Sequence, residues 1–148
     1  MQVHLATDHR GFELKEVLKR SIEELGSTVI DHGNTEYDAT DDYPDFASTA
    51  VRAVVAEGGD ARGIVLCGSG VGVSVVANKI RGARCVLGFD AEQVEHARQS
   101  DDCTILALPA DYLSESTALE LVRIFLETQY DGDESDRRRL QKVSALEK

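Results

Sequence analysis

The sequence lacks an excess of positive charge. Sixteen Lys and Arg residues stand against 27 Asp and Glu residues, which gives a formal net charge of -11. Proteins that bind nucleic acid or anionic membranes without sequence selectivity use positive charge to neutralise phosphates. The composition therefore argues against both classes of partner. It also makes phosphate binding costly unless arginines gather locally.

Cysteine is scarce, and long apolar runs are missing. Cys67, Cys85 and Cys103 are an odd number of thiols without metal-ligand spacing, which argues against a disulfide framework or a structural zinc site. No apolar stretch is long enough to span a bilayer, and the first residues enter a strand pattern without a leader. We expect a soluble, unprocessed protein with reduced thiols in the cytoplasm.

Strand and helix patterns alternate along the chain, without internal repeats or low-complexity segments. With 148 residues and 42% hydrophobic content, the chain suits one domain, residues 1–148, with a sizeable core. Apolar residues at helical spacing and short apolar runs define the elements. The predicted strands are 3–6, 28–30, 63–66, 85–89 and 104–108, and the predicted helices are 12–25, 46–57, 71–79, 91–99 and 114–128.

This alternation predicts an α/β fold of three layers, in which helices cover both faces of a five-stranded, mainly parallel sheet. Ligands bind such sheets at the edge where the parallel strands end, here called the carboxyl edge. That edge is expected to gather Asp8, His9, Cys67 and Ser69 with the residues that follow Phe89 and Leu108.

The C-terminal segment, residues 133–148, is charged and is predicted to form a helical extension. Leu140, Val143 and Leu146 make a narrow apolar stripe along it. Packing against another subunit and a solvated, frayed tail both remain open.

The chemistry centres on residues 67–72, with the sequence CGSGVG, which follow a buried strand and begin a helix. Glycines at alternate positions let the backbone approach a ligand, and the helix start offers unpaired amides and a positive dipole end. A cysteine there ionises more easily than a free one. Cys67 is therefore either a thiolate base or nucleophile beside an anion-stabilising cradle, or a small apolar residue that ends a core strand.

Three motifs agree in order and spacing over nearly the whole chain: residues 8–15 (DHRGFELK), 42–46 (DYPDF) and 67–72, with ANK following at 77–79. Together they resemble the ribose-5-phosphate isomerase B and galactose-6-phosphate isomerase family. The resemblance implies a Rossmann-like sheet, no cofactor, and a homodimer in which both subunits contribute to each cleft; pairing of two dimers remains open. It also implies aldose–ketose isomerisation, in which a base moves a proton between two sugar carbons through an enediolate.

By the same resemblance, Cys67 is the base and Ser69 assists it through its hydroxyl. The backbone amides of the following loop hold the oxyanion, Asp8 and His9 hold sugar hydroxyls and the ring oxygen, and Tyr43 lies at the rim. Without the resemblance, a turn-forming Asp, a satisfied His and a Tyr packed before proline would be the preferred interpretations. The loop residues in question are Gly68, Gly70, Val71 and Gly72.

The chain departs from the family where the sugar ring is opened. After the fourth helix the family carries a His-Asn pair that supplies an acid or base, and this chain has Ser100 and Asp101 there, which we keep as substrate-binding candidates. His96 lies four residues earlier on the same helical face, so it either reaches the cleft from one turn before or faces solvent.

The phosphate contacts depart as well. Asp111 and Glu134 stand where the family has arginines, and Arg138 is the counterpart of a later family arginine. Losing two charge-assisted contacts costs several kcal/mol, at about 1.5 to 3 kcal/mol each. The acids either point away, or Arg10 and the arginines beside Arg138 rebuild the site, or the substrate carries no phosphate there.

The sequence thus predicts a sugar or sugar-phosphate isomerase with Cys67 as base and an altered phosphate site. Free, amino or otherwise modified sugars are the expected substrates if the phosphate is absent. Two alternatives remain open: a catalytically silent sugar-binding paralogue, and one subunit of a hetero-oligomeric isomerase.

Overall fold

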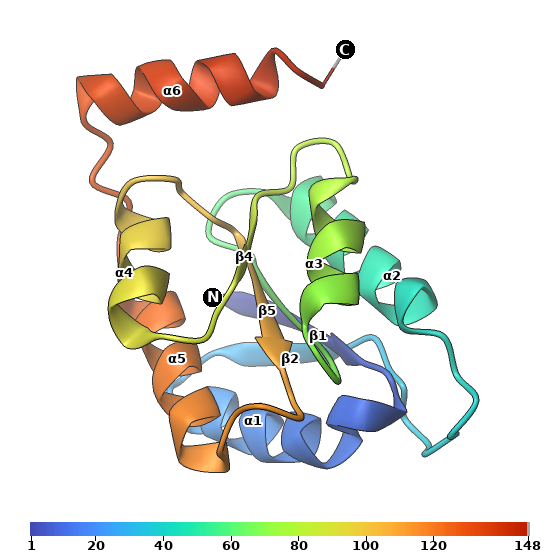
Figure 1. Cartoon of the computed structure of the whole chain (residues 1–148). Helices are drawn as coiled ribbons and strands as arrows, with labels where there is room; N and C mark the ends of the chain where they lie inside the picture. The colour runs from blue at the N-terminus through green and yellow to red at the C-terminus, as the bar shows by residue number, and fades with distance from the viewer. Residues whose placement is uncertain (148) are drawn as a thin grey trace.

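The computed structural model describes residues 1–147 and contains one five-stranded sheet in the order β2-β1-β3-β5-β4. All four strand pairings are parallel, as the alternation of strands and helices predicts (Figure 1). The strands are β1 (Gln2–Thr7), β2 (Thr28–Asp31), β3 (Arg62–Cys67), β4 (Cys85–Leu87) and β5 (Ile105–Pro109).

Helices connect the strands and cover both faces of the sheet, which makes the α/β, Rossmann-like three-layer arrangement (Figure 1). A short 3-10 helix (His9–Gly11) follows β1 where the sequence predicts a polar turn. The α-helices are α1 (Phe12–Glu24), α2 (Tyr43–Glu57), α3 (Val71–Asn78), α4 (Ala91–Gln99), α5 (Glu115–Glu127) and α6 (Glu134–Ser144).

The two faces of the sheet carry separate apolar cores. Leu18 of α1, Val94 of α4 and Phe125 of α5 pack with inward residues of one face, while Val51 of α2 and Val73 of α3 pack on the other. Side chains alternate along β3, so Ile64 and Leu66 enter the first core, and Val65 and Cys67 enter the second. The position of Cys67 in the α2–α3 layer follows from this alternation.

Within the sheet and the five helices that cover it, two element boundaries differ from the sequence prediction by more than one residue, each for a local reason. Helix α2 begins at Tyr43 instead of residue 46, because Pro44 is accommodated in the first turn, where its missing N–H is not needed. Strand β4 ends at Leu87 instead of Phe89, whose side chain is 63% exposed. Both shifts lie at the ends of elements whose type the sequence predicts correctly.

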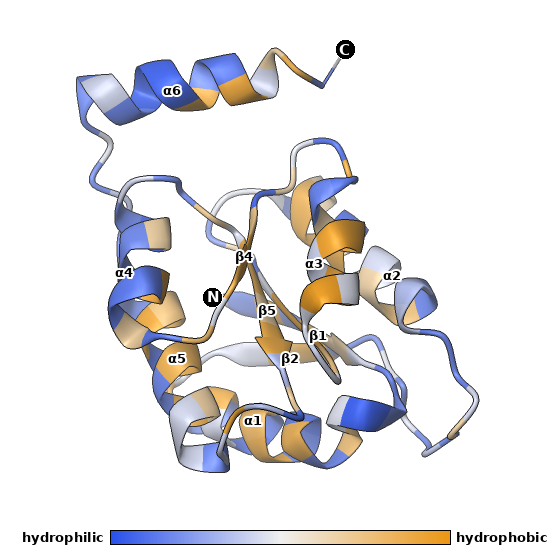
Figure 2. Cartoon of the chain, viewed as in Figure 1, coloured by the Kyte–Doolittle hydropathy of each residue, from blue (hydrophilic) through white to orange (hydrophobic). Residues whose placement is uncertain are grey.

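Helix α6 extends away from the body of the molecule (Figure 1). Its exposed surface is mostly polar, with a narrow apolar stripe (Figure 2). Beneath it lies an open hollow of about 550 Å³, to which the helix contributes Leu140 and Val143, and the body contributes Cys85, Ala97 and Cys103. Helix α6 lies within the predicted extension of residues 133–148, the last residue of which lies outside the described part of the chain. Among residues 1–147, no helix combines the length and apolar character that crossing a bilayer requires.

Candidate active site

Cys67 is the last residue of β3 and is 5% exposed at the carboxyl edge of the sheet. The chain then turns through Gly68, Ser69 and Gly70 into α3. Gly70 has a positive φ of 71°, and a Cβ there would lie 2.5 Å from Leu87 Cδ1. Both the conformation and the close neighbour require glycine at this position. The residues of Cys67–Gly72, here called the thiol loop, are therefore held where the sequence predicts them.

The start of α3 offers unpaired backbone donors beside the thiol. Gly70 precedes the helix and supplies no side-chain cap. The Val71 N–H donates to Ser69 Oγ at 3.3 Å, and the amides of Gly72 and Val73 have no partner among residues 1–147. A helix N-terminus with free amides attracts negative charge. An oxyanion next to Cys67 could accept hydrogen bonds there.

Tyr43 packs directly on the thiol loop. A Cβ built at Gly72 would lie 2.6 Å from Tyr43 Cζ, so the tyrosine ring occupies the space that a larger residue would need. The ring comes from the first residue of α2 and is partly exposed. Tyr43 thus forms one wall beside the loop, as expected for a residue at the rim of a cleft.

Asp8 follows β1 at the same edge. Thr7 pairs with Leu66 in the register of β1 and β3, so Asp8 continues beside Cys67. Its Oδ1 accepts a hydrogen bond from the Arg10 amide at 3.0 Å, and the residue is 5% exposed. Burial raises the pKa of the Asp8 carboxyl above its ordinary value, although the hydrogen bond from Arg10 works in the other direction.

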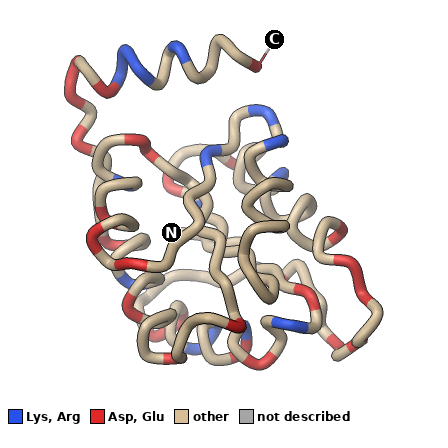
Figure 3. Tube along the Cα trace, in the orientation of Figure 1, with Lys and Arg blue, Asp and Glu red and all other residues tan. Residues whose placement is uncertain are grey.

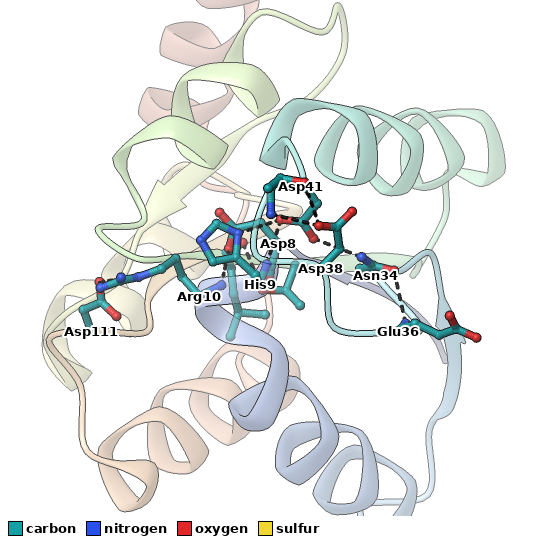
Figure 4. Close-up of polar contacts among 11 residues, drawn as sticks. Asp8, His9, Arg10, Asn34, Glu36, Asp38, Asp41 and Asp111 are labelled. Atoms are coloured by element: carbon teal, nitrogen blue, oxygen red, sulfur yellow. Dashed lines mark hydrogen bonds and ion pairs between the residues drawn. The ribbon is translucent and has the colours of Figure 1, made fainter.

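His9 is held by Asp41, a residue that the sequence analysis did not select. Asp41 Oδ1 accepts from the His9 backbone N–H at 3.0 Å and lies 2.7 Å from His9 Nδ1, and Asp41 Oδ2 accepts from Asn34 Nδ2 at 3.1 Å (Figure 4). Burial alone would raise the pKa of Asp41, but the hydrogen bonds from His9 and Asn34 hold it below its ordinary value. The only signal in the sequence is the acidic loop before Tyr43.

Asp8, His9 and Asp41 also form the group whose geometry could hold a cation. One potential ligand atom from each lies within 4.8 Å of the others. Two of these side chains already bond to each other, because His9 Nδ1 and Asp41 Oδ1 are 2.7 Å apart. The arrangement is explained by hydrogen bonding without an ion.

Arg10 and Asp111 close the other side of the thiol loop (Figure 4). The Arg10 Nε donates to Asp111 Oδ2 at 3.1 Å, and a guanidinium Nη2 contacts the same oxygen. A Cβ at Gly68 would lie 2.6 Å from Asp111 Oδ2, and the Asp111 amide donates to the Gly68 carbonyl at 2.9 Å. Asp111 therefore points toward the loop, and its carboxylate compensates the charge of Arg10.

Ser100, Asp101 and Arg138 do not join this group within one chain. Helix α4 starts at the carboxyl edge and runs back, so Ser100, which follows its end, lies at the opposite edge (Figure 1). There the Asp101 carbonyl accepts from Arg84 Nε at 3.0 Å. Arg138 is exposed on α6, along which Lys and Arg residues gather (Figure 3). A contribution from these residues would require a second chain.

Several other candidates have structural explanations. The side chain of Asn78 joins α3 to β4, since its Nδ2 donates to the Cys85 carbonyl and its Oδ1 accepts from the Cys85 amide, both at 3.0 Å. His96 is exposed on α4, and Glu134 is exposed at the start of α6. The structure therefore supports the second of the two interpretations of His96, which faces solvent.

The other two thiols lie outside the site. Burial raises the pKa of Cys103 to about 12 and also raises that of Cys85. Both groups therefore remain protonated near neutral pH, and all three cysteines are unpaired.

The chain matches a family model described as Ribose/Galactose Isomerase over residues 3–143. It is 36% identical over 146 residues to a probable ribose-5-phosphate isomerase B of Mycoplasma pneumoniae, covering 99% of this chain and 95% of that protein. It is 36% identical over 148 residues to ribose-5-phosphate isomerase B of Mycolicibacterium paratuberculosis, covering 100% and 92% respectively.

Solved structures give the same relationship in three dimensions. Ribose-5-phosphate isomerase B from Mycoplasma genitalium with bound ribulose-5-phosphate superposes with a TM-score of 0.95 at 32% identity, over 99% of this chain and 95% of that one. Type B ribose 5-phosphate isomerase of Trypanosoma brucei superposes with a TM-score of 0.93 at 33% identity, over 98% and 97%.

Proposed function

The chain belongs to the ribose/galactose isomerase family, and the relatives named above are aldose–ketose isomerases. We propose that it isomerises a sugar through an enediolate with Cys67 as the proton-transfer base. The observation that carries the proposal is the thiol at the end of β3, directly before the unpaired amides of α3. A positioned base next to oxyanion donors is what proton abstraction beside a carbonyl needs.

The substrate is proposed to lack a phosphate at the end that faces Asp111. Arg10 already has a carboxylate partner, so it offers a phosphate less net positive charge than a free arginine does. The second carboxylate of this region, that of Glu134, further disfavours an anion if a second chain brings α6 to the cleft. Carboxylates suit hydroxyls or an amine, so free or amino sugars fit this end of the site.

A homodimer with shared clefts is part of the proposal. Val71 and Val75 on α3 are 51% and 49% exposed, and Phe89 after β4 is 63% exposed. Val71 and Val75 are four residues apart and so share one face of α3, and exposed apolar patches mark interaction surfaces. A second copy of the chain bound there would cover these side chains. Its own Ser100 and Arg138 could then reach the cleft of the first chain. The three unpaired cysteines support a cytoplasmic location.

The experiment is solvent isotope exchange. Purified protein is incubated in D₂O with ribose, with glucosamine and with ribose 5-phosphate, and the deuterium incorporated at the sugar carbons is followed by NMR. We expect incorporation into an unphosphorylated sugar and a loss of about 10²- to 10⁴-fold in Cys67→Ala. The core variant Cys103→Ala is the control and should keep the activity.

Each part of the proposal can fail separately. Ligand-induced stabilisation without any exchange would identify a silent sugar-binding protein, and activity that appears only with a homologous chain would identify a mixed-subunit enzyme. Tight binding of ribose 5-phosphate or allose 6-phosphate would contradict the loss of the phosphate site while leaving the isomerase chemistry intact.

A further inference from the structure

A cyclic aldose has no carbonyl group, so the proton beside its anomeric carbon is not acidic until the ring opens. Opening needs an acid at the ring oxygen and a base at the anomeric hydroxyl. Both oxygens are attached to C1, next to the carbon whose proton Cys67 would take. The groups that open the ring must therefore lie close to Cys67. Asp8 and His9 follow Thr7, which pairs with Leu66, the residue before Cys67.

We infer that His9 and Asp8 are the acid and base that open the sugar ring, with Asp41 as the positioning residue for His9. This inference rests on the proposed function and adds a step to it. The Nδ1 of His9 lies 2.7 Å from Asp41 Oδ1, and a carboxylate on that side fixes the Nδ1–H tautomer and the orientation of the ring.

The other ring nitrogen of His9 is free to act. Nε2 has no hydrogen-bond partner among residues 1–147, and the side chain is 24% exposed, while that of Asp41 is 5% exposed. Asp41 also holds the backbone of His9, whose N–H donates to Asp41 Oδ1 at 3.0 Å. Asn34 holds the second oxygen of Asp41 at 3.1 Å, so the carboxylate is fixed on both sides. His9 is thus a fixed imidazole with one nitrogen available to a ligand.

Asp8 supplies the partner base. A carboxylate oxygen of Asp8 lies within 4.8 Å of a ring nitrogen of His9, so the two side chains are neighbours. The Arg10 amide donates to Oδ1 of its carboxylate at 3.0 Å, and the Gly11 amide is a weaker backbone partner. Burial raises the pKa of Asp8, which makes its carboxylate a better proton acceptor than an exposed one.

The step balances with these two groups. Protonated His9 gives the Nε2 proton to the ring oxygen as the bond between that oxygen and C1 breaks, and the bonding electron pair remains on the oxygen. The anomeric hydroxyl gives its proton to the Asp8 carboxylate, and the electron pair of that O–H bond forms the C1 carbonyl. One proton has passed from His9 to Asp8, and exchange with water restores both groups.

Ring opening is measured apart from isomerisation in a Cys67→Ala background, where the proton-transfer base is missing. The readout is the interconversion of ribose anomers, followed by NMR magnetisation exchange. We expect Cys67→Ala protein to accelerate it over buffer, and addition of His9→Asn to reduce the acceleration by about 10²-fold or more. The exposed His96→Asn change is the matched control and should leave the acceleration unchanged.

Asp41→Asn separates positioning from folding. It should slow anomer interconversion by about ten-fold or more, while deuterium exchange into erythrulose, a ketose too short to close a ring, stays within about two-fold in the Cys67 enzyme. Equal loss of both rates would show a structural role and overturn the inference. So would a Cys67→Ala protein that does not accelerate anomer interconversion, or a His9→Asn change without effect. The proposed function is tested independently by isotope exchange in the unmodified chain.

Discussion

At the scale of single residues, the site is defined by how closely its neighbours approach the thiol loop. Gly70 is closed in by Leu87, Gly72 by the Tyr43 ring and Gly68 by the Asp111 carboxylate. Each of the three glycines is therefore required by a different neighbouring group, and of the three only Gly70 also has a positive φ. A larger residue at each of these positions should displace a different neighbour: Leu87, the Tyr43 ring or the Asp111 carboxylate.

Gly72→Ala is expected to displace Tyr43, because the new methyl group would lie 2.6 Å from Tyr43 Cζ. Overpacking of this kind lowers the free energy of unfolding by about 1 to 3 kcal/mol. Thermal unfolding of the variant measures it. In the double variant with Tyr43→Ala the clash is gone, so the two effects should not add. Strict additivity would show that the ring and the loop are not in contact.

Asp111→Arg tests the altered phosphate site. It replaces the carboxylate that neutralises Arg10 by a cation, so an anion at this end would meet two arginines in place of an ion pair. We expect kcat/KM for ribose 5-phosphate to rise by about ten-fold or more, since one charge-assisted hydrogen bond is worth about 1.5 to 3 kcal/mol. Glu24→Arg, the same charge change at the exposed end of α1, is the control. An unchanged preference would place the phosphate elsewhere.

At the scale of elements, one buried ion pair joins α1 to the end of β2. Lys15 is fully buried, and its Nζ donates to Asp31 Oδ1 and Oδ2 at 2.8 and 2.7 Å and to the Asn34 carbonyl at 2.8 Å. These contacts tie the first helix to the loop that carries Asn34 and Asp41. The His9–Asp41 pair depends on the position of that loop, so the ion pair supports the site from outside it.

Asp31→Asn is expected to lower the free energy of unfolding by about 3 to 5 kcal/mol, because it leaves a buried ammonium without its carboxylate. Glu16→Gln is the matched control: Glu16 lies 3.5 Å from the same ammonium but is half exposed, and its loss should cost about 0.5 kcal/mol or less. Denaturant unfolding measures both. Equal effects would contradict the role assigned to the buried pair.

The same pair predicts a pH dependence of stability. Burial of Asp31 works toward a higher pKa, but the hydrogen bond from Lys15 and that from the Gly33 amide hold the pKa below its ordinary value of 3.8. The stabilisation is therefore present above that value and is lost as the pH falls through the lowered pKa. Melting temperatures measured from neutral to acidic pH should fall less steeply in Asp31→Asn than in the unmodified protein. Parallel curves would show that another carboxyl group dominates.

At the scale of the whole molecule, the predicted site residues do not all lie together within one chain. The carboxyl edge holds Cys67, the free amides of α3, Tyr43 and the His9–Asp41 pair, whereas Ser100 lies at the opposite edge and Arg138 on the projecting α6. If the proposed homodimer completes the cleft, a substitution that prevents the two chains from associating should also abolish the activity.

Val75→Glu tests this coupling. It places a charge on the exposed apolar side of α3, and we expect a monomer by sedimentation and a loss of activity of about ten-fold or more. Leu25→Glu, at a residue that is 42% exposed just after α1, should alter neither property. A monomeric variant with full activity would show that each chain has a complete site.

The sequence by itself determined the α/β alternation, the parallel sheet and the place of Cys67 at a strand-to-helix turn. Strands and helices are indicated by apolar residues that recur with periods of 2 and 3.6, and the turn is indicated by glycines next to Cys67. All of these signals lie within a few residues of each other in the sequence. The sequence also placed Asp8 and His9 at the carboxyl edge, since residues that follow parallel strands meet there, whereas Tyr43 is expected at the rim only from the family resemblance.

Only the tertiary structure decided which charged groups pair. Lys15 with Asp31, His9 with Asp41 and Arg10 with Asp111 are separated by 16, 32 and 101 residues along the chain. No periodic pattern specifies such partners, because each acidic residue in these loops is locally equivalent to its neighbours. The fold brings one particular acidic residue within hydrogen-bond distance of each partner. The His9–Asp41 pair supports the inferred ring-opening groups, and the Arg10–Asp111 pair supports the proposed change of substrate.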